Sequence, residues 1–96
     1  MTIFWTRRAL RHLVAVREYI ASDSPHHAGR LAAQILQAVE LLAGQRGMGR
    51  PGRILGTREL IVAGTPFLIS IPYLVRGTRV ELIAIFHGRP KWPSNL

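Results

Sequence analysis

His87 is the residue of this chain best suited to acid–base chemistry, and it follows the apolar run Val80–Phe86 (VELIAIF). An imidazole exchanges its proton near neutral pH, so His87 could act as the general acid or base of a phosphoryl transfer. Arg58 and Arg89 could hold the phosphate, because guanidinium groups bind it bidentately and stabilise developing charge. These residue types allow weak cleavage of RNA through its own 2′-hydroxyl. The alternative is that His87 only ends a strand and caps a carbonyl group.

Other motifs that could bind a ligand do not support a site. His26 and His27 are adjacent in a predicted helix and cannot face one ligand, and no cysteine or carboxylate stands at ligand spacing. The glycine-rich segment Gly47–Gly52 lacks the lysine–serine/threonine ending and the following helix of a phosphate-binding loop. His12 is expected to be solvated. We therefore expect no metal and no cofactor.

Positive charge is the most informative total. Thirteen Lys and Arg residues against five Asp and Glu residues give a formal net charge of +8, and twelve of the thirteen cations are arginine. This imbalance favours a polyanionic partner, such as nucleic acid or an acidic protein, although a GC-rich genome would also enrich arginine. The cluster Arg7, Arg8 and Arg11 is either a solvated face or a contact surface. The residues expected to bind a partner are Arg7, Arg8, Arg11, Arg58, Arg79, Arg89, Lys91 and Trp92.

Length and composition predict one domain spanning residues 1–96 in the cytoplasm. The chain has 96 residues, of which 48% are hydrophobic, and no cysteine. No apolar run approaches the roughly 18 residues that cross a bilayer, and the start of the chain lacks the apolar core of a signal peptide. No membrane partner is expected.

Two helices after a short strand are predicted in the first half of the chain. Ile3–Trp5 is the strand, Thr6 is the N-cap of a helix from Arg7 to Ala21, and Ser24 is the N-cap of a helix from Pro25 to about Ala43. The short connection makes the two helices an antiparallel hairpin. The positions expected to form apolar faces are Leu10, Leu13, Val14 and Ile20 in the first helix and Ala28, Leu31, Ala32, Ile35, Val39 and Leu42 in the second.

The residue pattern in the second half of the chain predicts a loop followed by three strands. Gly44–Gly52 is expected to be a loop, followed by an antiparallel meander of Thr57–Ala63, Pro66–Val75 and Arg79–His87. Pro72 lacks a backbone N–H, which favours an edge or a bulge at that point. The expected fold class is α+β, with the helical hairpin on one face of a small twisted sheet. Simple alternation along the last strand places five side chains on one face: Arg79, Glu81, Ile83, Ile85 and His87.

Three stretches together resemble the RelE/ParE superfamily of toxins from bacterial type II toxin–antitoxin systems. They are Arg30–Leu36 (RLAAQIL), Gly56–Val62 followed by Thr65–Ile69, and Leu82–Pro93 (LIAIFHGRPKWP). The resemblance implies a growth-inhibiting toxin held inactive by a tightly bound antitoxin. RelE-like members cut mRNA on the ribosome, whereas ParE-like members poison DNA gyrase and are not known as nucleases.

The departures from RelE-like nucleases favour the ParE-like type. The chain has one lysine, Lys91, its tyrosines Tyr19 and Tyr73 lie outside the tail, and Pro90 and Pro93 prevent a C-terminal helix. The prediction is a toxin acting on gyrase and neutralised by an antitoxin with an acidic segment. A RelE-like ribonuclease that meets ribosome and mRNA, and a basic nucleic-acid-binding module without toxicity, remain alternatives. Trp92 either folds back over the sheet or contacts a partner.

Overall fold

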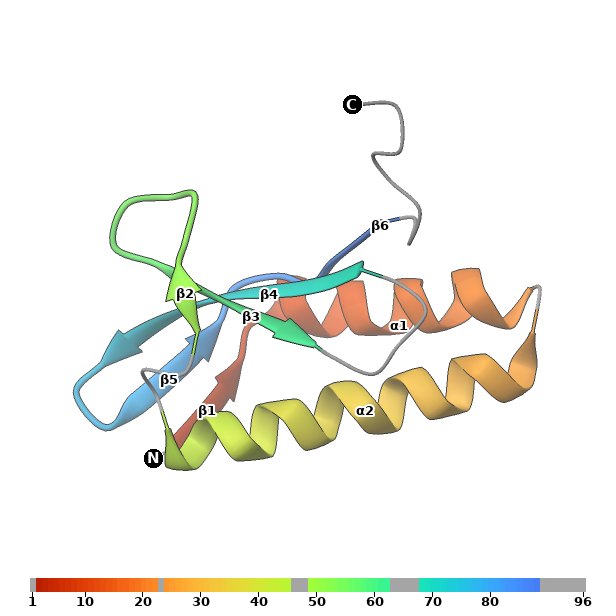
Figure 1. Ribbon diagram of the computed structural model, residues 1–96, viewed down its shortest axis with the longest axis horizontal. Coiled ribbons are helices and arrows are strands. Elements are labelled where there is room, and N and C mark those ends of the chain that lie inside the picture. The colour runs from red at the N-terminus through yellow and green to blue at the C-terminus, as the bar shows by residue number, and fades with distance from the viewer. Residues whose placement is uncertain (1, 23, 46–48, 63–67, 89–96) are drawn as a thin grey trace.

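Two helices cover one face of a mixed sheet in the computed structural model (Figure 1), which describes residues 2–22, 24–45, 49–62 and 68–88. The predicted α+β class and the order of strand, two helices and strands are confirmed. No helix within these ranges is long and apolar enough to cross a membrane. The elements are β1 (Thr2–Trp5), α1 (Arg7–Ala21), α2 (Pro25–Gly44), β2 (Arg50–Pro51), β3 (Arg58–Val62), β4 (Leu68–Arg76), β5 (Arg79–Leu82) and β6 (Phe86–Gly88).

Both helices begin at the predicted capping residues. The Thr6 hydroxyl oxygen accepts a hydrogen bond from the Ala9 backbone N–H at 3.1 Å, and the Ser24 hydroxyl oxygen accepts one from the His27 N–H at 3.3 Å. Each cap satisfies an N–H group that has no partner within the helix. Pro25 occupies the first turn of α2, where its missing N–H loses nothing.

The buried face of α1 differs from the predicted one. The side chains that enter the core are spaced as Ala9, Leu13, Val16 and Ile20, whereas Leu10 and Val14 are 48% and 56% exposed. One residue corresponds to about 100° around a helix, so α1 is rotated by roughly one position from the expected orientation. The small side chain of Ala9 is fully buried in the first turn of α1, close to the end of β1 in the sequence.

The α2 prediction is confirmed for five of its six core positions. Ala32 is only half-buried. The α2 residues that enter the core are Ala28, Leu31, Ile35, Val39 and Leu42.

The sheet has the order β1-β5-β4-β3-β2, and β6 also pairs with β4. Strands β3, β4 and β5 form the predicted antiparallel meander. Strand β1 extends the sheet by pairing in parallel with β5. Two predictions are wrong. The expected loop Gly44–Gly52 contains the short strand β2, which pairs with β3, and the expected continuous strand Arg79–His87 is interrupted at residues 83–85.

One extra residue explains that interruption. Leu82 pairs with Tyr73 and Phe86 pairs with Ser70, so three steps along β4 correspond to four steps between β5 and β6. This is a β-bulge, and it lies opposite Pro72, where an edge or bulge was predicted.

Candidate functional site

The bulge is held by side chains of the first helix and its cap. The Pro72 carbonyl accepts a hydrogen bond from the Ile83 N–H at 2.9 Å, but Pro72 cannot return one, as an ordinary residue in an antiparallel pair would. The Thr6 hydroxyl lies 3.2 Å from the Ile83 carbonyl oxygen and 2.7 Å from the Leu82 carbonyl oxygen. The Thr6 hydroxyl therefore donates to the carbonyl groups of this segment, at the point where Pro72 has no N–H to offer.

His12 completes this arrangement and is half-buried, whereas it was expected to be a solvated residue. Its Nδ1 atom accepts a hydrogen bond from the Ile85 backbone N–H at 3.1 Å, so this nitrogen carries no proton. An unpaired N–H at a buried position costs free energy, and Ile85 is only 3% exposed. His12 is thus a structural partner of the bulge, which the sequence analysis missed.

The extra residue changes the face on which His87 lies. Val80 and Leu82 enter the core, so Arg79 and Glu81 lie on the face without helices. His87 pairs with the buried Ile69 on the helix side, and its ring lies 5.2 Å from that of Tyr19 in α1. The prediction that one face carries both the charged pair and the histidine is wrong, because the bulge resets the alternation.

A groove of about 300 Å³ lies between α1 and β6. The rings of His12 and Phe86 are 6.0 Å apart within it, and His87 lies at its exposed edge. Among the described residues, the lining includes no arginine and no carboxylate: it consists of His12, Ala15, Val16, Ile85, Phe86 and His87. The groove therefore offers imidazole groups without a phosphate clamp in the described part of the chain.

The structure does not bring Arg58 to His87. Arg58 pairs with Tyr73, and His87 pairs with Ile69, four residues earlier in β4. At the usual rise of a strand these two partners lie about 13 Å apart along β4. The Arg58 Nη1 donates a hydrogen bond to the Gly49 carbonyl at 2.7 Å. Arg89, the other predicted phosphate ligand, lies outside the described residues. No group of three potential metal ligands occurs in the ranges that the structure describes.

The helix-free face carries a first cluster of two arginines around one carboxylate. Glu81 forms ion pairs of 3.1 Å with Arg76 and with Arg79, and the Arg79 guanidinium carbon lies 4.1 Å from the centre of the Phe4 ring. Arg79 is thus held by an ion pair and a cation–π contact together. The cluster keeps a net charge of +1.

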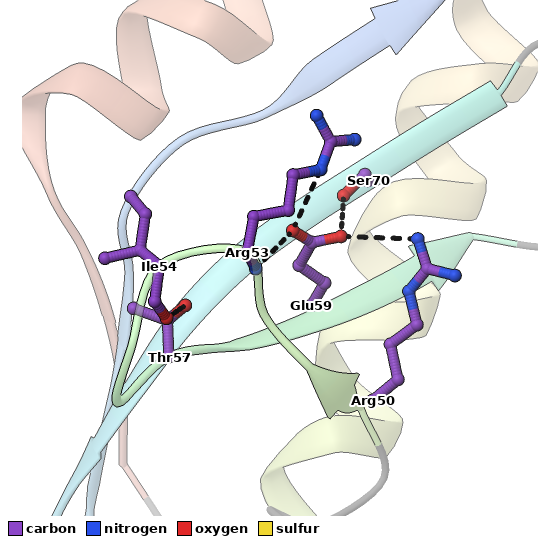
Figure 2. Close-up of polar contacts among 6 residues, drawn as sticks. All are labelled: Arg50, Arg53, Ile54, Thr57, Glu59 and Ser70. Atoms are coloured by element: carbon purple, nitrogen blue, oxygen red, sulfur yellow. Dashed lines mark hydrogen bonds and ion pairs between the residues drawn. The ribbon is translucent and has the colours of Figure 1, made fainter.

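A second such cluster surrounds Glu59 (Figure 2). Its carboxylate is 3.4 Å from Arg50 and 3.5 Å from Arg53, and it accepts hydrogen bonds from the Arg53 backbone N–H and the Ser70 hydroxyl. Burial by itself would raise the pKa of Glu59, but the Arg53 N–H and the Arg50 and Arg53 guanidinium groups together lower that pKa below the usual glutamate value. Glu59 and Arg58 lie on opposite faces of β3, as predicted.

Comparisons with known proteins agree with this fold. A family model described as "ParE toxin of type II toxin-antitoxin system, parDE" matches residues 3–92. The chain belongs to this ParE toxin family. "Putative toxin Y4kP" of Sinorhizobium fredii is 44% identical over 94 residues, covering 98% of this chain and 95% of that protein. "Toxin RelE2" of Caulobacter vibrioides is 36% identical over 86 residues, covering 90% and 93%.

A solved structure gives the same result. The "Chromosomal ParDE TA system from P. aeruginosa" matches with a TM-score of 0.74 and 31% sequence identity, over 88% of this chain and 92% of that chain. The predicted membership in the RelE/ParE superfamily is therefore confirmed, and the family model gives the ParE branch.

The predicted contact residues of this ParE-family toxin are spread over the molecule. Arg7, Arg8 and Arg11 are exposed on α1, and the Arg79 side chain is 48% exposed on the helix-free face. Lys91 and Trp92 lie outside the described residues. The arginines that the structure groups around carboxylates are instead Arg50, Arg53, Arg76 and Arg79.

Proposed function

We propose that this ParE-family toxin acts in the cytoplasm by binding DNA gyrase, and that a cognate antitoxin with an acidic segment neutralises it. Family membership supports a toxin of a type II toxin–antitoxin pair. The similar structure from Pseudomonas aeruginosa belongs to a ParDE toxin–antitoxin system, which supports an antitoxin partner.

The environment of His87 is the observation that favours binding over RNA cleavage. Its ring packs near Tyr19, no arginine or carboxylate among the described residues lines its groove, and Arg58 points to the Gly49 carbonyl instead. Cleavage of RNA needs an acid, a base and positive charge at one phosphate. These groups are dispersed in the described part of the chain, so we assign toxicity to surface recognition.

The helix-free face is the proposed surface for the antitoxin. The carboxylates Glu59 and Glu81 on this face are each flanked by two arginines whose side chains are between 48% and 78% exposed. Guanidinium donors not used by these carboxylates are available to acidic side chains. An acidic segment that folds on binding would gain both charge complementarity and apolar contacts there.

The RelE-like alternative has one relative in its favour, since "Toxin RelE2" is 36% identical to this chain. Under that alternative His87, Arg58 and Arg89 would be catalytic, and the ribosome and mRNA would be the partners.

Translation of a pre-made mRNA in a purified cell-free system, followed by primer extension, tests the proposal. Such a reaction has no need of gyrase, so we expect full translation and no cuts. Ribosome-dependent cuts in the mRNA would establish the ribonuclease instead.

A further inference from the structure

The loop between β2 and β3 presents two adjacent aliphatic side chains to solvent. Ile54 is 68% exposed and Leu55 is 99% exposed. The loop projects from the sheet on the side away from the helices (Figure 1). We call Ile54 and Leu55 the tip. Single exposed apolar residues are common on proteins, but an adjacent pair on a projecting loop is a larger apolar surface than packing of this chain requires.

The tip is fixed by its own hydrogen bonds. The Gly52 N–H donates to the Thr57 carbonyl at 2.8 Å, and the Thr57 N–H and hydroxyl both donate to the Ile54 carbonyl, at 3.0 Å and 2.6 Å (Figure 2 shows the hydroxyl contact). Gly56 has a φ of +87°, which disfavours other residues. A Cβ on Gly52 would collide with the Thr57 hydroxyl. This turn therefore fixes the course of the backbone that carries Ile54 and Leu55.

The base of the loop is fixed as well. The Glu59 carboxylate accepts the Arg53 backbone N–H at 3.2 Å and pairs with the Arg53 and Arg50 guanidinium groups (Figure 2). Those two side chains remain 78% and 62% exposed, so positive charge flanks the apolar tip. A loop whose backbone is already ordered loses less conformational entropy when it binds, which favours affinity.

We infer that the tip is a binding element of this toxin, and that Ile54 and Leu55 insert into an apolar pocket rimmed by carboxylates on the folded protein that the toxin inhibits. The inference rests on the proposed function in so far as the inhibited molecule is a protein. It goes further by naming the element that engages the target and the chemistry of the complementary pocket.

A folded target fits the tip better than the antitoxin or a second copy does. A convex tip needs a preformed pocket, which a segment that folds only on binding does not offer. A second copy would bring another +8 charge, and its Glu59 and Glu81 are each already flanked by two arginines. The acidic antitoxin is accordingly assigned to the sheet surface and the target to the tip.

The test compares the double variant Ile54→Ser/Leu55→Ser and the single variant Leu55→Ser with the control Leu41→Ser. Leu41 is 65% exposed on α2, so its substitution removes a similar apolar surface away from the loop. Each variant is expressed without antitoxin to measure growth arrest, and each is titrated with purified gyrase and with purified antitoxin.

We expect the loop variants to lose growth arrest and to bind gyrase at least about tenfold more weakly, because two aliphatic side chains no longer leave water. Their antitoxin affinity and urea midpoint should match the wild type, and Leu41→Ser should match in every assay. Full growth arrest by the double variant would overturn the inference. So would an equal loss of antitoxin affinity, or an equal loss of activity in Leu41→Ser.

The growth assay tests whether the tip is needed for toxicity, whatever the identity of the target protein. If the wild-type chain does not bind gyrase, the proposed target fails. Loss of growth arrest in the loop variants alone would then still support the tip as the element that meets another protein, provided translation reactions show no mRNA cuts. If such cuts appear and need the tip, the inference of a protein pocket fails too.

Discussion

Removing the charge of Glu59 should destabilise the toxin by an amount that depends on pH. Glu59→Gln keeps the size of the side chain but replaces one acceptor oxygen by an NH₂ donor. In the wild type, the Glu59 carboxylate accepts hydrogen bonds from the Arg53 N–H and the Ser70 hydroxyl and faces the Arg50 and Arg53 guanidinium groups. In the variant an NH₂ group must face at least one of these donors.

The contacts of Glu59 determine how much unfolding free energy the substitution removes. The two guanidinium groups are 62% and 78% exposed, so each ion pair is worth only about 0.2–1 kcal/mol. The hydrogen bond from the Arg53 N–H is charge-assisted, in the class worth about 1.5–3 kcal/mol, and a glutamine oxygen would keep part of it. We expect a loss of about 1–2 kcal/mol in the free energy of unfolding at pH 7.

The sign of the pH dependence follows from the lowered pKa of Glu59. In the folded chain this carboxylate resists protonation more than in the unfolded chain, so its stabilisation is complete above the ordinary glutamate pKa of about 4.3. It is lost as the pH falls through the lower folded pKa. The difference between wild type and Glu59→Gln should therefore be largest at neutral pH and shrink below about pH 4.

Urea unfolding at a series of pH values between 7 and 3 measures that difference. Glu40→Gln, at an exposed position of α2, controls for loss of one negative charge. Equal stability of wild type and Glu59→Gln at pH 7, or a difference that does not change with pH, would refute the reasoning.

Substitutions at three further positions, His12, Tyr73 and His87, test other parts of the account. His12→Ala should cost about 1–2 kcal/mol of stability because it leaves the Ile85 N–H without its acceptor. His12→Asn, whose amide oxygen reaches the Nδ1 position, should restore much of this loss, and His12→Gln should not. Hydrogen exchange of the Ile85 amide measures the effect, and equal exchange in all three variants would contradict it. Tyr73→Phe should cost about 1–2 kcal/mol in urea unfolding because the Tyr73 hydroxyl oxygen accepts the Gly49 N–H at 2.9 Å, and an unchanged midpoint would count against that bond. His87→Ala should leave growth arrest intact, and near-complete loss would favour the ribonuclease.

Local contacts made the helix starts predictable. Thr6 and Ser24 cap through contacts three residues along the chain, so their roles follow from the adjacent sequence. The rotation of α1 did not follow, because Leu10 and Val14 are as apolar as Leu13 and Val16. Packing against the sheet decides which of these side chains is buried.

The bulge likewise combines a feature that the local sequence predicts with one that depends on distant contacts. Pro72 predicted a defect in the ladder, but the extra residue lies in the neighbouring strand and depends on the pairing of β5 and β6 with β4. The hydrogen bond between His12 and Ile85 joins residues 73 positions apart, so nothing near His12 in the sequence indicates it. Consequently the face of His87, the most prominent candidate for chemistry, was predicted wrongly although its strand was found.

A gyrase supercoiling assay tests the central claim most directly. Purified toxin is added to gyrase and relaxed plasmid, with and without its antitoxin, alongside His87→Ala. We predict that both wild type and His87→Ala inhibit supercoiling, and that the antitoxin restores it. Full supercoiling in the presence of a toxin preparation that still arrests cells would contradict the assignment of gyrase as the target.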